Sequence, residues 1–155
     1  MKNVLYLYYD DTDKVTIFVV EEGQFKVRCK PELILNEACL QSGCNYRGVK
    51  ESFSCLTHSF QKIPICISVL HQIIFIPTLS EKARGCCFIQ YRKIRKVKRV
   101  DDQCCMVEFQ NGLIQVFACS DRVIKRQMIR CERFLNKVLD ISGLHLPVIE
   151  QVKKI

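Results

Sequence analysis

The strongest local constraint in the sequence is the dipeptide Asn111-Gly112, which separates two β-rich runs. Both residues accept the positive φ of a type I′ turn, so residues 104–109 and 113–118 are predicted to form a hairpin. A helical pattern follows at once, with apolar residues recurring on one face from Asp121 to Ile141 and with Ser120 in position to cap it. Paired strands and an amphipathic helix must then share one core, which favours an α+β fold.

The remaining patterns extend this picture of antiparallel strands. Pro31 suits the first turn of a short helix, whereas residues 43–48 have the composition of a loop bounded by two glycines. Gly143 and Pro147 are placed to end the C-terminal helix. Apolar residues recur every third position in 91–100, which fits neither strand nor helix periodicity, so this segment stays unassigned. Further strand patterns cover residues 4–9, 15–20, 25–29, 65–69 and 72–76, the first three as a meander.

The composition is that of a globular protein. Hydrophobic residues make up 48% and charged residues 26% of 155 residues, a length that suits a single domain over 1–155. No run approaches the ~18 apolar residues of a membrane span. The N-terminal apolar run is short and meets Asp10 and Asp11 at once, unlike a signal peptide. We therefore expect a cytoplasmic protein without a membrane partner.

The eleven cysteines do not predict a metal site or a disulfide scaffold. Their number is odd and their spacing is scattered, and the nearest chelating set, Cys39, Cys44, Cys55 and His58, lacks the repeated C-x2-C of zinc sites. We expect reduced thiols that fill apolar positions. Phosphate-loop, nucleophile-elbow and zinc-protease motifs are also missing from the sequence, so no enzyme, catalytic residue, metal or cofactor is predicted.

The charge is concentrated in the second half of the chain. Residues 1–80 hold 8 Lys/Arg and 8 Asp/Glu, whereas residues 81–155 hold 16 and 8, which accounts for the net charge of +8. A basic half favours a polyanionic partner, because each neutralised phosphate releases counterions. Few aromatic residues are available for stacking on single strands, so duplex DNA is favoured. The candidate DNA-binding residues are Arg47, Lys50, Lys62, Arg92, Lys93, Arg95, Lys96, Lys98, Arg99, Arg122, Lys125, Arg126 and Arg130.

Five motifs in one order carry a resemblance to a known family. They are GCNYRGVK at 43–50, KIPI at 62–65, FIPTLS at 75–80, CCFI at 86–89 and FQNG at 109–112. Their order and spacing resemble the competence transcription factor ComK family, over about residues 39–134. The chain departs from the family pattern at Gln61, where His is usual, at Phe88, where Trp is common, and at Cys44-Asn45, where the family has paired serines.

The resemblance implies a single ComK-like DNA-binding domain that activates genes for DNA uptake in a Gram-positive bacterium. Such a protein would bind paired A/T-rich promoter boxes through the minor groove, as a homodimer or higher oligomer on the nucleoid, and would contact RNA polymerase. The tail segment through which longer members reach an adaptor and a Clp protease is missing after Leu146, so we do not expect that control here. The alternatives are a protein–protein regulator that pairs with a longer relative, and an RNA-binding module.

Overall fold

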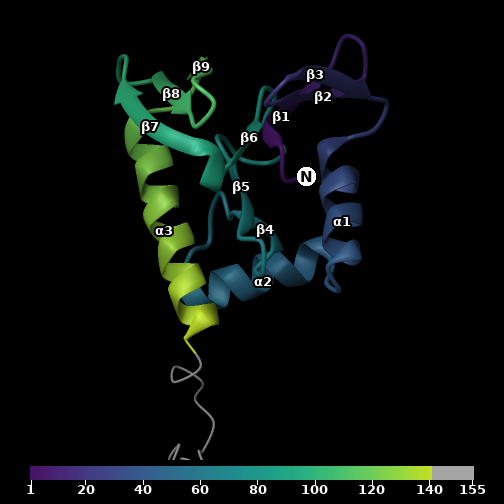
Figure 1. Cartoon of the computed structure of the whole chain (residues 1–155), viewed down its shortest axis with the longest axis vertical. Coiled ribbons are helices and arrows are strands. Elements are labelled where there is room, and N and C mark those ends of the chain that lie inside the picture. The colour runs from purple at the N-terminus through teal and green to yellow at the C-terminus, as the bar shows by residue number, and fades with distance from the viewer. Residues whose placement is uncertain (141–155) are drawn as a thin grey trace, which may run out of the picture.

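The computed structural model describes residues 1–140, which form two antiparallel sheets and three α-helices (Figure 1). The larger sheet has six strands in the order β3-β2-β1-β6-β5-β4, and the smaller has the order β7-β8-β9. The elements are β1 (Val4–Asp10), β2 (Val15–Val20), β3 (Gly23–Val27), α1 (Pro31–Gln41), α2 (Tyr46–Thr57), β4 (Ile65–Ser68), β5 (Ile73–Pro77), β6 (Cys87–Gln90), β7 (Ile94–Arg99), β8 (Cys105–Phe109), β9 (Ile114–Phe117) and α3 (Asp121–Leu139).

The α+β prediction and most predicted elements are confirmed. β1, β2 and β3 form the expected meander, although Val20 pairs directly with Gly23, so β3 begins two residues earlier than predicted. The hairpin at Asn111-Gly112 joins β8 to β9 as predicted, but the predicted type I′ geometry is wrong. Gly112 has φ 91°, whereas Asn111 has no positive φ, and the Gly112 amide donates to the Phe109 carbonyl, as in a three-residue turn that ends in a glycine bulge. Pro31 opens α1, and Ser120 caps α3 by accepting a hydrogen bond from the Val123 amide. Helix α3 ends at Leu139, while the predicted stop signals Gly143 and Pro147 lie outside the described residues.

The predicted loop over residues 43–48 is wrong in its second half, because α2 begins there. Asn45 is the N-cap of α2, and its side-chain oxygen accepts a hydrogen bond of 2.6 Å from the Gly48 amide. Gly48 lies in the first turn of this helix, although glycine has a low helix propensity. In a sequence, glycine usually indicates a turn, which is why a loop was predicted. The cap and the burial of Tyr46 and Phe53 outweigh that cost. No helix was predicted over 46–57, and α2 occupies that range.

A register shift explains the segment that periodicity left unassigned. Residues 91–93 form a 3-10 turn, and β7 follows with an irregularity between Ile94 and Lys96 in its pairing with β8. A bulge adds one residue to one strand and so changes the spacing of side chains on a face from two to three. Ile94 and Val97 can therefore both face the core despite lying three residues apart.

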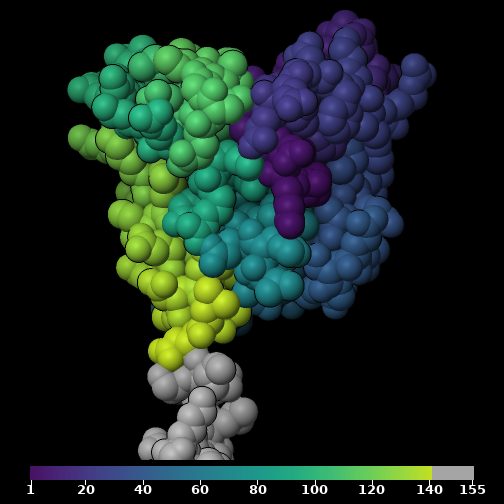
Figure 2. Space-filling view, in the orientation of Figure 1, coloured from purple at the N-terminus to yellow at the C-terminus, as the bar shows by residue number. Residues whose placement is uncertain are grey.

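The six-stranded sheet is the central layer, and each of its faces is covered differently. One face packs against α1 through a cluster that includes Leu7, Leu35 and Phe75. The other face packs against α3 and the smaller sheet, and α2 runs across one end of the molecule (Figure 1). Central strand β6, which no sequence pattern predicted, pairs with β1 and β5 and unites the meander with β4 and β5. Figure 2 shows the smaller sheet, in green, touching the purple N-terminal strands at the top of the molecule.

Among residues 1–140, no helix has both the length and the apolar character needed to cross a membrane. All eleven cysteines fall in this range as free thiols, and six of them are buried, as expected of thiols that serve as small apolar side chains.

We expect the purified protein to be folded in reducing buffer without bound zinc. Within the described part of the chain, no three ligating side chains gather to hold a metal ion. Metal analysis should give far less than one zinc per chain, and a chelator should leave the melting temperature unchanged. One zinc per chain, with unfolding on chelation, would contradict this expectation.

Candidate nucleic-acid interface

Helix α3 starts with a well-defined N-terminus. The Ser120 hydroxyl accepts from the Val123 amide, and Asp121 in the first turn forms an ion pair of 3.0 Å with Lys125 one turn later. This pair holds the pKa of the Asp121 carboxyl below its ordinary value. The carboxylate also lies at the positive end of the helix dipole, where it is favourable. The charge of Lys125, one of the predicted site residues, is therefore already matched.

One face of α3 is anchored in the core. Ile124, Cys131 and Leu135 are buried there, and the Phe134 ring stacks on Phe53 of α2 with centroids 4.8 Å apart. The buried Gln127 side chain donates to the backbone carbonyl of Lys62 in the segment between α2 and β4. These contacts determine which face of α3 is turned to solvent.

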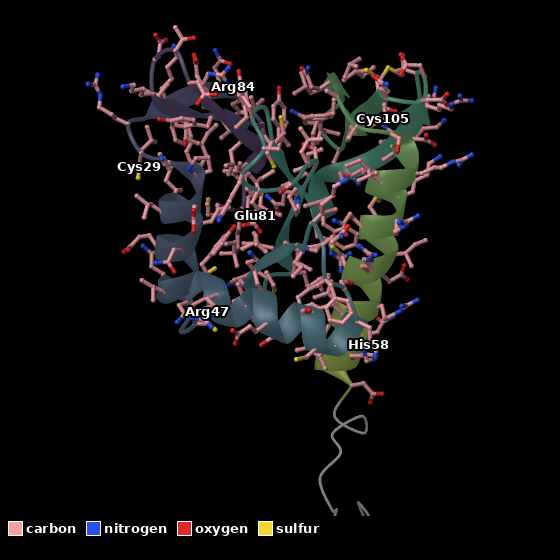
Figure 3. All side chains as sticks on the ribbon, turned by 180° about the vertical axis from the view of Figure 1, so that it is seen from behind. Cys29, Arg47, His58, Glu81, Arg84 and Cys105 are labelled. Atoms are coloured by element: carbon pink, nitrogen blue, oxygen red, sulfur yellow. The ribbon has the colours of Figure 1, made fainter. Side chains whose placement is uncertain are left out.

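The solvent face of α3 carries a row of guanidinium groups, which we call the arginine ridge: Arg122, Arg126, Arg130 and Arg133. None of them has an ion-pair partner among residues 1–140. Partial burial, together with the neighbouring charges of Arg126 and Arg133, lowers the pKa of Arg130, although an arginine remains charged throughout the physiological range. Figure 3 shows nitrogen-tipped side chains projecting from α3 on the side away from the sheets. The ridge is an uncompensated cationic surface.

The dimensions of the ridge suit a nucleic-acid backbone. From Arg122 to Arg133 the helix rises about 16 Å at ~1.5 Å per residue. One strand of a duplex carries a phosphate about every 3.4 Å along the axis, so the ridge spans about five phosphates. A row of cations at this spacing can neutralise several of them.

Two lysines of β7 lie on the outer face of the smaller sheet, because Ile94 and Val97 of the same strand face the core that α3 covers. Strand β7 contacts α3 at its N-terminal end, as Figures 1 and 3 both show. Lys96 and Lys98 are exposed and have no ion pair in the described chain, whereas Arg95 lies 3.9 Å from Glu108 and Arg99 lies 2.5 Å from Asp102. Two of the four basic residues of β7 are thus neutralised by nearby carboxylates.

Three other residues that were predicted to bind DNA make different local contacts. Lys93 forms an ion pair of 2.5 Å with Glu21 between β2 and β3, which ties the two sheets together. The Arg92 guanidinium lies over the Tyr91 ring, 5.7 Å from its centroid. Lys62 has no ion pair within residues 1–140, and its carbonyl is held by Gln127 of α3.

Arg47 and Lys50 are not brought to the ridge. Both lie in the first half of α2, and Figure 3 places Arg47 at the end of α2 opposite α3. Arg47 pairs with Glu51 one turn later, and Lys50 pairs at 3.0 Å with Glu81. Tyr46 packs inward beneath Lys50, and its burial raises the pKa of its hydroxyl.

We expect Lys50→Ala to act on stability and Arg47→Ala to have little effect. Removing Lys50 leaves the partly buried Glu81 without its cation and should lower the free energy of unfolding by about 1 kcal/mol. Arg47 is 89% exposed, so its replacement should change stability by less than about 0.5 kcal/mol. Urea denaturation measures both values. If Arg47→Ala lowered the affinity for DNA, the DNA interface would include α2 as well as the ridge.

Arg133 was missed as a site residue on sequence reasoning, although the signal was present. Positions 122, 126 and 133 fall on one side of a helix with 3.6 residues per turn. Arg133 therefore continues the line of Arg122 and Arg126, and it lacks an ion-pair partner in the described chain.

The chain matches the family model described as ComK protein over residues 4–141. No curated protein and no solved structure matches it.

Proposed function

Because the chain belongs to the ComK family of competence transcription factors, we propose that it regulates transcription by binding double-stranded DNA through the arginine ridge. The observation that carries this proposal is the row of Arg122, Arg126, Arg130 and Arg133 without ion-pair partners in residues 1–140. Four uncompensated guanidinium groups on one helix face repel one another, and a polyanion relieves that repulsion.

We propose A/T-rich promoter boxes as the target, read through the minor groove. A-tract minor grooves are narrow and electronegative, and an inserted arginine senses this shape without reading individual bases. Arg122, Arg126 and Arg133 of the ridge are exposed and have no carboxylate partner in the described chain. Direct base reading would instead use bidentate contacts in the major groove.

The wider biological proposal follows from the family. The protein would act in the cytoplasm at promoters of DNA-uptake genes, would assemble on two boxes, and would contact RNA polymerase as an activator. A dimer on two boxes matches the symmetry that paired sites impose. The cysteines would take no part in catalysis, since the family is one of transcription factors.

A binding experiment tests this proposal. Affinity should be measured for a duplex with two A/T boxes, a G/C duplex and an RNA duplex of equal length, each over a series of salt concentrations. We expect the A/T duplex to bind at least about tenfold more tightly than the others, with log K falling steeply against log salt. Tightest binding to RNA would favour the RNA-binding alternative. Weak binding to all three would favour the protein–protein regulator.

A further inference from the structure

Phe60 is a large aromatic side chain that does not contribute to the core. It lies between α2 and β4, and it is 79% exposed to solvent. The next most exposed phenylalanine, Phe25, is 48% exposed and stacks on Phe18 of β2 with ring centroids 4.7 Å apart. Single apolar side chains are common on protein surfaces, so exposure alone gives Phe60 no role. Its backbone and its neighbours on both sides do point to one.

The backbone around Phe60 is held in an unusual conformation. His58 and Lys62 have φ values of 55° and 49°, in the left-handed region that residues other than glycine adopt only rarely. Such a conformation persists only where surrounding contacts hold it. Ser59 supplies one contact, since it is buried and its carbonyl accepts a hydrogen bond from the Ser54 hydroxyl. The Phe60 ring is therefore presented to solvent from a fixed segment, and binding would cost little backbone ordering.

On one side, this segment lies against the arginine ridge. The buried Gln127 side chain of α3 donates to the Lys62 carbonyl, and its oxygen accepts a hydrogen bond of 3.2 Å from the Arg130 guanidinium. Residues three apart in a helix lie on one side of it. The segment that carries Phe60 therefore adjoins the ridge at Arg130.

On the other side, Phe60 lines a groove of about 490 Å³ together with Lys62 and Lys82. Neither lysine has an ion pair within residues 1–140. Glu81 also lines the groove, but its carboxylate is paired with Lys50 at 3.0 Å. The exposed ring is thus flanked by unpaired cations, with the ridge on one side and the two lysines on the other.

We propose that Phe60 inserts as a wedge between two base pairs of the bound duplex, from its minor groove. This inference rests on the proposed function and adds to it an apolar contact with the bases. Proteins that bind the minor groove use phenylalanine in this way, and they unstack a base step in doing so. The unpaired cations beside the ring would contact the phosphates of the two strands. A duplex suits these surroundings better than an apolar protein surface, because such a surface would bury the cations without partners.

The wedge would give the protein a preference within A/T-rich sequence. A TA step unstacks easily, whereas runs of adenine are stiff. Arginines that sense a narrow groove would select the A-tracts, and Phe60 would select a flexible step beside them. The ridge and Phe60 would therefore recognise different features of one site.

The experiment uses duplexes with two A/T boxes in which the adenines are replaced one at a time by 2-aminopurine. The fluorescence of this base rises when it loses its stacked neighbours, so it reports where a step is opened. We expect saturating wild-type protein to raise the fluorescence at TA steps, and we expect Phe60→Ala to abolish that rise and to weaken binding about tenfold. The slope of log K against log salt should stay at the wild-type value, because the ring neutralises no phosphate.

Two variants serve as controls. Leu70→Ala removes an apolar side chain that is 84% exposed in the β4–β5 turn, outside the ridge, and should change neither the fluorescence nor the affinity. Phe60→Leu keeps an apolar wedge and should retain part of the rise. A wild type that binds A/T duplex without opening a step, or a Phe60→Ala protein that still opens it, would overturn the wedge and leave the DNA-binding proposal intact. A wild type that binds no duplex would overturn both.

Discussion

Replacing Arg122 and Arg126 together with glutamine is expected to weaken binding to A/T-rich duplex roughly 100-fold, at about 1.5 kcal/mol for each lost charged contact. If both residues neutralise phosphates, the slope of log K against log salt should also fall by about 2. Neither arginine has an ion-pair partner among residues 1–140, so the substitutions break no pair within the protein. Titrations by fluorescence anisotropy at several salt concentrations measure both quantities.

The matched control replaces two exposed lysines in the neutral half of the chain, Lys2 and Lys14, which have no ion pair among residues 1–140. This variant loses the same charge, but its residues lie in the N-terminal segment and in the turn between β1 and β2, outside the ridge. Its affinity and salt slope should stay close to those of the wild type. Equal effects from the two variants would point to a general charge effect and would favour the protein–protein alternative. If one of these arginines occupies an A-tract groove, its removal should in addition reduce the preference for A/T over G/C duplex.

Phe53→Ala is expected to lower the free energy of unfolding by about 3–5 kcal/mol. Phe53 is fully buried, and its ring stacks on Phe134 of α3. Alanine would leave a cavity between α2 and α3, where the surrounding strands and helices can close only in part. Such a loss is a large fraction of the stability of a domain this size. Urea denaturation followed by circular dichroism measures the change.

Phe60→Ala serves as its control, because Phe60 is 79% exposed in the segment after α2. This substitution removes the same number of atoms without opening a cavity, and should change stability by less than about 0.5 kcal/mol. A loss below about 1 kcal/mol in Phe53→Ala would mean that the α2–α3 contact is not part of the cooperative core.

Elements determined by interactions between near neighbours were predicted well from the sequence. The β8–β9 hairpin depends on the positive φ of Gly112 in its turn, and α3 depends on its cap and on apolar residues at helical spacing. The family itself could be identified from five short motifs, and the match over residues 4–141 bears this out. Elements determined by distant partners were missed. Helix α2 starts with a glycine in its first turn, and β6 is stabilised by its neighbours β1 and β5.

The candidate interface, too, could be predicted from the sequence only in part. The amino-acid sequence already shows that the positive charge lies in residues 81–155 and that arginines gather on one helix face. Which of those charges remain unpaired depends on the folded chain. Glu21 lies 72 residues before Lys93, and Glu81 lies 31 residues after Lys50, yet each pair is in contact. A charge interacts through space and not along the chain, so its partner is known only once the fold brings the two side chains together.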